Sequence, residues 1–277
     1  MQRMNGPMIV RTVCLFTDHA SAGSVERLQE LASRLAGRGF SIQTTRLCCP
    51  DVDSVFELDR LGDGGIASSP YFPSAAYERN GFAVGLQPTN LSAGCSTIEE
   101  WLERLEAVWG EVEQAVGDAE DYLGIDTSIA PLSAGEGSFV GFLKRIGLPL
   151  ERAATSDALI RISNHIRAPT VKSVGLRGLM FACLEDFDLA AEYDQGRFPM
   201  EHCLYLALHS GLGIDSYPIG VDEDSQRVVE ILRCAQGLSN KHRKPLSARF
   251  ISDGRARIGE RTRLSSPYLT DVTIRPL

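Results

Sequence analysis

Acidic residues follow four apolar runs of this chain, each at a position where a buried strand is expected to end. Parallel strands present their carboxyl ends at one edge of a sheet, where α/β proteins place ligands and catalysis. The sequence therefore predicts a group of carboxylates at that edge. An acid after a strand can instead cap the next helix through its side-chain oxygen, so capping is the alternative for each one. The acids are Asp18, Asp126, the pair Glu185 and Asp186, and Asp215.

Two kinds of chemistry suit three of these acids. Asp126, Glu185 and Asp215 carry hard oxygen ligands that can bind a divalent cation such as Mg²⁺, Mn²⁺ or Ca²⁺. They can also act as general acids and bases, because mutual repulsion raises the pKa of at least one of them. We therefore expect Asp126, Glu185 and Asp215 to be catalytic residues and, in the first alternative, metal ligands.

Other polar residues near these runs can complete a site. His209 lies just before the Asp215 run, and an imidazole, which titrates near neutrality, can shuttle protons there. Arg46, at the exit of another expected strand, can hold a substrate carboxylate through two hydrogen bonds. Ser128 and Asp18 are further candidates for substrate binding. A helix-capping hydroxyl at Ser128 and a purely structural imidazole at His209 are the alternatives.

Apolar runs alternate with amphipathic segments along the whole chain, which favours one α/β domain over residues 1–277 with a mainly parallel sheet. Residues 1–8 are expected to be a disordered lead, and residues 50–80 an irregular insertion or a lid. Strands are expected at residues 9–16, 40–45, 82–86, 121–125, 176–184, 211–214 and 246–251. Helices are expected from Ser21 or Ser24 to about residue 35, and within 97–117, 133–147, 155–166, 199–209 and 223–237.

The helix at residues 97–117 carries the clearest signals. Thr97 and Glu100 form a capping box, in which each side chain bonds the backbone of the first turn. Trp101 and Trp109 follow on the apolar face, so they belong either to the core or to an interface between subunits.

Composition excludes several classes of function. The formal net charge is −8, and the basic run at residues 241–244 fits a helix C-terminus, so nucleic-acid binding is not expected. No run reaches the roughly 20 apolar residues of a membrane span, and no signal peptide is apparent, which predicts a cytoplasmic protein. A dinucleotide loop is not expected at Gly211–Gly213, because Pro218 prevents a phosphate-binding helix directly after it, so NAD is not predicted.

The chain has seven cysteines, of which only Cys48 and Cys49 are adjacent. An odd number, with most in apolar runs, fits reduced thiols in a cytosolic protein. The Cys48–Cys49 pair is open to redox, metal-binding and structural interpretations, although no CxxC spacing or histidine partner supports zinc.

Several short segments follow one another in a recognisable order: Ile9–Val13, Gln43–Arg46, Gly124–Pro131, Leu184–Asp186, Gly211–Pro218 and Asn240–Arg249, followed by Gly254 and Gly259. Together these segments resemble the domain-of-unknown-function family 711. This resemblance implies an α/β barrel like that of pyruvate formate-lyase and its glycyl-radical relatives, and it implies no defined activity. The chain is shorter than typical members of the family, so barrel strands are expected to be missing or supplied by a second subunit.

A radical mechanism is not expected, because Arg257–Glu260 differs from the loop that carries the glycyl radical. Without that glycine, Cys48–Cys49 is not comparable to a thiyl pair. The sequence then favours a non-radical enzyme, a homo-oligomer, that isomerises, eliminates from or hydrolyses a small anionic metabolite. The alternative is a non-catalytic binding or scaffold protein on a degenerate barrel, which dimerises through the helix at 97–117.

Overall fold

A computed structural model describes residues 12–15, 41–44, 82–120, 122–210, 212–242 and 246–277. The helix expected near residues 21–35 and the irregular segment at 50–80 lie outside the described residues, as do Asp18, Arg46, Cys48 and Cys49.

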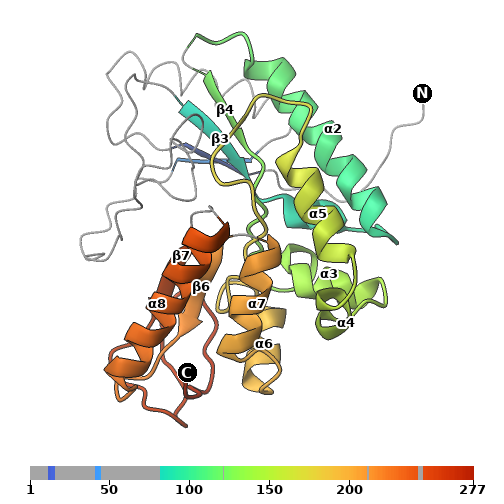
Figure 1. Cartoon of the computed structure of the whole chain (residues 1–277). Coiled ribbons are helices and arrows are strands. Elements are labelled where there is room, and N and C mark those ends of the chain that lie inside the picture. Colours follow the sequence, from blue (N-terminus) through green and yellow to red (C-terminus); the bar gives the residue numbers. More distant parts are fainter. Residues whose placement is uncertain (1–11, 16–40, 45–81, 121, 211, 243–245) are drawn as a thin grey trace.

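A five-stranded sheet forms one part of the molecule, in the order β2-β1-β3-β4-β5 (Figure 1). Neighbouring strands are parallel except β1 and β3, which run in opposite directions. The sheet is therefore mixed, and the prediction of a mainly parallel sheet holds for three of its four strand pairs. Its strands are β1 (Thr12–Leu15), β2 (Ser41–Thr44), β3 (Phe82–Leu86), β4 (Tyr122–Asp126) and β5 (Ser173–Val174).

A second sheet pairs β6 (Gly213–Pro218) with β7 (Ser247–Ile251) in parallel. Isolated parallel bridges join the two sheets: Ile129 pairs with Leu179, and Ala182 pairs with Asp215. The strand expected at residues 176–184 is thus reduced to single bridges. The result is an α/β structure with largely parallel pairing, and no closed barrel forms among the described residues.

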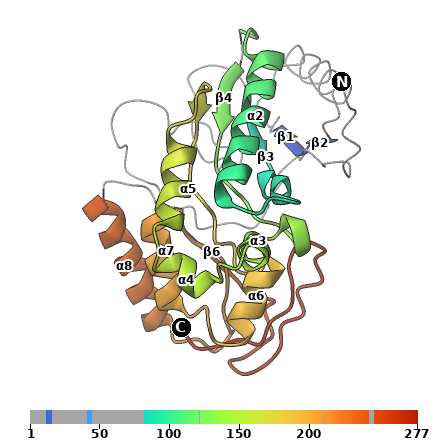
Figure 2. The ribbon, with the colours of Figure 1, turned by 90° about the vertical axis from the view of Figure 1, so that its right-hand side faces the viewer.

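Helices cover both sheets. Figures 1 and 2 show α2 and α5 side by side next to β4, while α6 and α7 lie on one side of β6 and α8 runs along β6 and β7. The α-helices are α2 (Ile98–Val116), α3 (Phe139–Arg145), α4 (Leu150–Ala154), α5 (Ala158–Arg167), α6 (Phe187–Asp194), α7 (Met200–Ser210) and α8 (Ser225–His242). Two short 3₁₀ helices, η1 (Pro88–Ser92) and η2 (Gly135–Gly137), precede α2 and α3.

The helix α2 confirms the prediction from its capping signals. The Thr97 side chain accepts a hydrogen bond from the backbone N–H of Glu100, and the Glu100 carboxylate accepts one from the N–H of Ser96. Both tryptophans are buried within the chain, at 0% exposure for Trp101 and 1% for Trp109. Trp101 packs on Phe142, with ring centroids 5.1 Å apart. The tryptophans therefore belong to the core of this chain.

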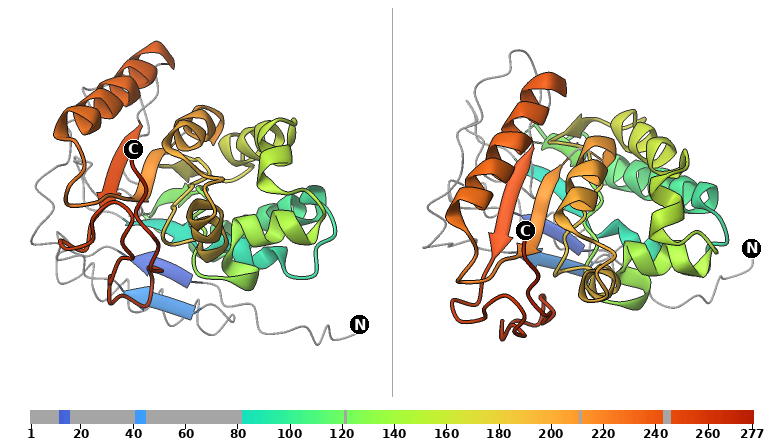
Figure 3. Two further views of the ribbon diagram at one scale, coloured as in Figure 1. Left: turned by 90° about the horizontal axis from the view of Figure 1, so that it is seen from below. Right: turned by 60° about the horizontal axis from the view of Figure 1, so that its bottom comes forward.

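The C-terminal segment after β7 has no regular helix or strand, yet it packs on the domain (Figure 3). Val272 is fully buried in the main core, and the backbone N–H of Thr270 donates to the carbonyl of Leu184. The segment after β7 is therefore part of the core of the described chain. None of the helices in the described part of the chain is long and apolar enough to cross a membrane.

Candidate active site

Arg249 on β7 gathers three oxygen-bearing side chains around one guanidinium. Its Nε donates to Asp215 Oδ1 at 2.7 Å, and its Nη2 donates to Glu185 Oε1 at 2.5 Å. Nη2 also donates to Ser216 Oγ at 2.9 Å, and Ser216 Oγ in turn donates to Glu185 Oε1 at 2.5 Å. We call these four residues, Glu185, Asp215, Ser216 and Arg249, the Arg249 cluster.

An irregularity in β6 brings two of these oxygens to the same guanidinium. Ile214 pairs with Ala248 and Tyr217 pairs with Phe250, so Asp215 and Ser216 together lie opposite Arg249. Such a two-to-one bulge bends a strand and redirects its side chains, and bulges are frequent beside active sites. In a regular strand Asp215 and Ser216 would point to opposite faces, and only one would reach Arg249.

Glu185 comes from a different part of the chain. It ends the turn that follows the bridge at Ala182, and its backbone N–H donates to the carbonyl of Ala182. Its own carbonyl accepts from the N–H of Ser133 at 2.6 Å. The backbone of Glu185 is thus fixed on two sides, which places its side chain over β6 beside Ser216 and Arg249.

The carboxylates of the cluster differ in their contact with water. The side chain of Asp215 is 4% exposed, that of Glu185 is 23% exposed, and that of Arg249 is 52% exposed. Burial raises the pKa of Glu185, and the Asp215 charge adds to this rise against the opposing effect of Arg249 and the Ser216 hydroxyl. Burial disfavours the charge on Arg249, but Asp215 and Glu185 outweigh it and raise the Arg249 pKa.

Some atoms of the cluster remain available to a ligand. Within the described residues, neither Arg249 Nη1 nor Glu185 Oε2 takes part in a hydrogen bond. Both side chains are partly exposed, at 52% for Arg249 and 23% for Glu185. The cluster can therefore hold an acceptor group such as a carboxylate, and it can exchange a proton with it.

Asp126 does not share the partners of the Arg249 cluster. Its Oδ1 accepts hydrogen bonds from the backbone N–H and the hydroxyl of Ser128, at 3.0 and 2.6 Å, and from the N–H of Arg177. Gly175 lies so close that a Cβ there would come within 2.2 Å of Asp126 Oδ2. Asp126 and Ser128 are each 1% exposed, and Ser128 Oγ also accepts from Gly178 N–H. Their observed contacts thus bind together the turns after β4 and β5.

The pairing of the strands explains why Asp126 and Asp215 lie apart. Asp126 is level with Val174, whereas Asp215 is level with Ala182, eight positions further along the same segment (174 to 182). In addition, Asp215 is the third residue of β6 and does not follow its end. The expectation that Asp126 and Asp215 lie at one common edge of a sheet was therefore wrong.

Asp186 performs the capping role that was the alternative for each acid. Its carboxylate accepts from the backbone N–H groups of Asp188 and Leu189 at the start of α6. It also accepts from the N–H groups of Phe139 and Val140 at the start of α3, and from the hydroxyl of Ser138 at 2.5 Å. Burial raises the Asp186 pKa to about 6, although these donors oppose the rise.

His209 lies near the end of α7 and packs on Tyr205, with ring centroids 4.7 Å apart. Its backbone carbonyl accepts from the hydroxyl of Ser163, and no bond joins its ring to the Arg249 cluster. Among the described residues, no group of three His, Cys, Asp or Glu side chains is placed to hold a metal ion. The structure thus brings together two of the three acids that were expected as metal ligands, Glu185 and Asp215, around an arginine.

Sequence reasoning missed Arg249 and Ser216. Arg249 is the only charged residue in Leu246–Ile251, which was expected to be a strand, and its place in an otherwise uncharged strand was a usable signal. Ser216 offered no comparable signal, since its role depends on the bulge in β6.

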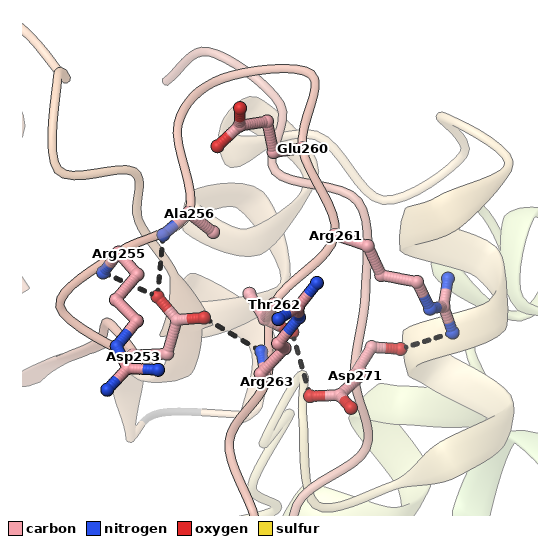
Figure 4. A pocket seen from close by; sticks show the side chains of 8 residues that line it. All are labelled: Asp253, Arg255, Ala256, Glu260, Arg261, Thr262, Arg263 and Asp271. Atoms are coloured by element: carbon pink, nitrogen blue, oxygen red, sulfur yellow. Dashed lines mark hydrogen bonds between the residues drawn. The ribbon is translucent and has the colours of Figure 1, made fainter.

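A surface depression of about 650 Å³ lies among the loops of the C-terminal segment and shares no residue with the Arg249 cluster (Figure 4). Its acids are already bound to the chain. Asp253 accepts from three backbone N–H groups, and those of Ala256 and Arg255 contribute most to lowering its pKa. Asp271 accepts from the hydroxyl of Thr262 and the N–H of Leu264. These contacts shape the loops, so the Arg249 cluster is the stronger candidate site.

Comparison with known proteins adds a family and no activity. No curated protein and no solved structure matches the chain. The family model described as "Uncharacterised ACR (DUF711)" matches residues 84–265, which is more than half of the chain. This match includes Glu185, Asp215, Ser216 and Arg249. The chain therefore belongs to the DUF711 family.

Proposed function

We propose that this protein is an enzyme that transfers protons on a small anionic metabolite bound at the Arg249 cluster. The observation that carries the proposal is Arg249, whose side chain is half-exposed and whose guanidinium is bonded to a buried Asp215 and to a Glu185 with a raised pKa. Arg249 is the anchor for the substrate in this proposal, and Arg46, the anchor expected from the sequence, lies outside the described residues. Isomerisation, elimination and hydrolysis are the reaction classes that such an arrangement can support.

The charges of the cluster favour a protonated Glu185. With every group ionised, two carboxylates and one guanidinium leave one excess negative charge, which would repel an anion. Protonation of Glu185 brings this sum to zero, and the raised pKa of Glu185 acts in the same direction. A neutral cluster whose Arg249 Nη1 makes no hydrogen bond to the described residues can then bind a substrate carboxylate.

In this scheme each residue has one task. Arg249 holds the substrate anion, and Asp215 keeps the guanidinium in place through Nε. Glu185 gives its proton to a leaving group or carbonyl oxygen of the substrate, and as a carboxylate it takes a proton back. Arg249 already supplies a positive charge between the two acids. We therefore favour acid/base chemistry over the metal-assisted chemistry that the sequence left open.

We also propose that the complete fold is the barrel that the family resemblance implies. The pairing runs from β2 through β4 to the segment at 179–182, then to β6 and β7, and forms an open arc. A barrel like that of pyruvate formate-lyase would require further pairing between the two ends of this arc.

A panel of small anions tests the proposal even though the substrate is unidentified. The protein is incubated in D₂O with short mono- and dicarboxylates and phosphate esters, and proton NMR follows deuterium uptake and conversion. We expect turnover of at least one compound, and a rate about 10²–10⁴-fold lower for Glu185→Gln because the acid/base group is lost. Arg249→Lys should weaken binding by about 10-fold or more, because a lysine cannot form the paired hydrogen bonds.

Arg257→Lys is the matched control, since Arg257 is an exposed arginine that pairs with Asp222 at 3.8 Å. It should leave binding and turnover unchanged. Turnover that persists in Glu185→Gln would contradict the role of the acid, and a wild-type protein that neither binds nor converts any of the compounds would contradict the proposal as a whole. Circular dichroism confirms that each variant remains folded.

A further inference from the structure

Ser216 combines burial, backbone strain and a central position in the Arg249 cluster. Its side chain is fully buried, at 0% exposure. Its φ angle is +45°, in the left-handed region that favours glycine. A non-glycine residue held there is strained, and such residues concentrate at functional sites. Because glycine would meet the backbone requirement without strain, the serine side chain itself requires an explanation.

The hydroxyl of Ser216 joins the two groups that would meet a substrate. It donates to Glu185 Oε1 at 2.5 Å and accepts from Arg249 Nη2 at 2.9 Å. Arg249 Nη2 donates to the same Glu185 oxygen, so Oε1 receives two hydrogen bonds. Together the three contacts form a closed triangle that fixes the rotation of the Glu185 carboxyl group. The second oxygen, Oε2, is thereby left as the one that can face a ligand.

The bulge in β6 is what makes this contact geometrically available. Asp215 and Ser216 share the position opposite Arg249, and the left-handed turn at Ser216 directs its hydroxyl towards the guanidinium. The same turn allows Asp215 to bond Arg249 Nε. One local distortion of a strand therefore serves both oxygens.

We propose that Ser216 is a positioning residue, whose hydroxyl fixes Oε1 of Glu185 against Arg249 so that Oε2 exchanges the proton with the substrate. This inference rests on the proposed function, because it assigns the proton of that reaction to one oxygen of Glu185. Ser216 does not itself contact the substrate, since its side chain is enclosed.

The groups that face Glu185 determine the pKa of its carboxyl group. Arg249 on β7 and the hydroxyl of Ser216 stabilise the charged carboxylate, while Asp215 on β6 and burial oppose it. The neighbouring Asp186 carboxylate is bonded to the starts of α3 and α6. Removal of the Ser216 hydroxyl takes away one donor to the charged form, so the Glu185 pKa should rise further.

The experiment compares Ser216→Gly and Ser216→Ala with the wild-type protein. Carbon NMR of protein labelled at the glutamate carboxyl carbon follows the titration of Glu185, which is assigned by the loss of its signal in Glu185→Gln. We expect an upward shift of the Glu185 midpoint in both variants. The glycine variant should also be more stable than the alanine variant, because glycine adopts φ +45° without the strain that the Cβ of alanine causes.

Ser265→Gly is the matched control, because Ser265 is an exposed serine with φ +51°. It relieves the same kind of strain and should leave the Glu185 midpoint unchanged. A Glu185 midpoint that stays in place or falls in Ser216→Gly and Ser216→Ala would overturn the inference. A glycine variant that does not fold would overturn it as well, since the side chain would then serve the fold and not the acid.

This readout uses the protein without any substrate and is therefore separate from the test of function. If the Glu185 midpoint rises but no compound is bound or converted, the positioning contact stands and the proposed function fails. If turnover depends on Glu185 but the Glu185 midpoint does not change in the Ser216 variants, the function stands and the role of Ser216 is refuted.

Discussion

Arg249 holds a nearly enclosed carboxylate and an accessible one at the same time. Asp215 is 4% exposed, so its charge depends on the two contacts with Nε and Nη2 of Arg249. Glu185 is 23% exposed and is therefore in contact with water. In the proposed function, this asymmetry gives Asp215 a structural task and Glu185 the chemical one, which is how paired carboxylates acquire different roles.

At this scale we predict that Arg249→Met lowers the free energy of unfolding by about 2–4 kcal/mol, because it leaves the buried Asp215 charge unpaired. The double variant Asp215→Asn with Arg249→Met should recover about 1–3 kcal/mol of this loss, since the amide carries no charge. Urea denaturation at neutral pH measures both values. Arg257→Met, on an exposed pair with Asp222, should cost less than about 1 kcal/mol. An Arg249→Met protein as stable as Arg257→Met would contradict the argument.

At the scale of elements, Asp186 connects two helices through their N-termini. Each helix begins with N–H groups that have no partner within the helix, and a carboxylate there also meets the positive end of the helix dipole. Because one side chain serves both α3 and α6, it fixes the turn that contains Glu185. Capping is thus linked to the placement of the candidate acid.

We predict that Asp186→Ala lowers the free energy of unfolding by about 2–4 kcal/mol, because two helix caps are lost at once. The pKa of Asp186 is raised to about 6, above its value in the unfolded chain, so the native state binds the extra proton. The stability that this titration contributes is present below about pH 4 and is lost as the pH rises through about 6. The difference in free energy of unfolding between wild type and Asp186→Ala, measured by urea denaturation, should therefore become smaller from about pH 4 to about pH 7.

Asp188→Ala provides the control for this prediction. Asp188 lies two residues further on, is 31% exposed, and contacts Lys144 at 3.9 Å. Its removal should cost less than about 1 kcal/mol at each pH. The opposite result would be a difference in free energy of unfolding between wild type and Asp186→Ala that widens with rising pH. It would mean that the five hydrogen-bond donors affect the Asp186 pKa more than burial does, and that this pKa is lowered.

At the scale of the whole molecule, the C-terminal segment completes the core in the absence of regular secondary structure. The backbone of Thr262 and Val272 pairs across this segment, and the Arg275 side chain donates to the carbonyls of Tyr193 and Asp194 on α6. These contacts, together with the bond from Thr270 to Leu184, place the segment against the turn that carries Glu185.

We predict that Val272→Ala lowers the free energy of unfolding by about 1–3 kcal/mol, because it removes buried methyl groups and leaves a cavity. Val221→Ala makes the same change at a side chain that is 49% exposed, and it should be close to neutral. Thermal or urea denaturation of both variants provides the measurement. Equal stabilities of the two variants would mean that the segment is not part of the cooperative unit.

Much of the fold follows from local patterns. The capping box at Thr97, the apolar face with Trp101 and Trp109, and the alternation of strands with helices correctly predict α2 and most of the other described elements. The local pattern of an acid after an apolar run also identifies Glu185 and Asp215 as candidate site residues. These features depend on residues close in sequence, since hydrogen-bond caps and helical periodicity act over a few positions.

The sequence by itself determined the family, the α/β class and the supply of acids that a site requires. Only the tertiary structure decided which of them meet, because strand register and the bulge at Asp215 and Ser216 depend on pairing between distant segments. The stagger between β4 and β6 separates Asp126 from Asp215, and the pairing of β6 with β7 brings in Arg249. A shift of one residue in such a pairing turns a side chain to the opposite face, so no local pattern could specify the cluster.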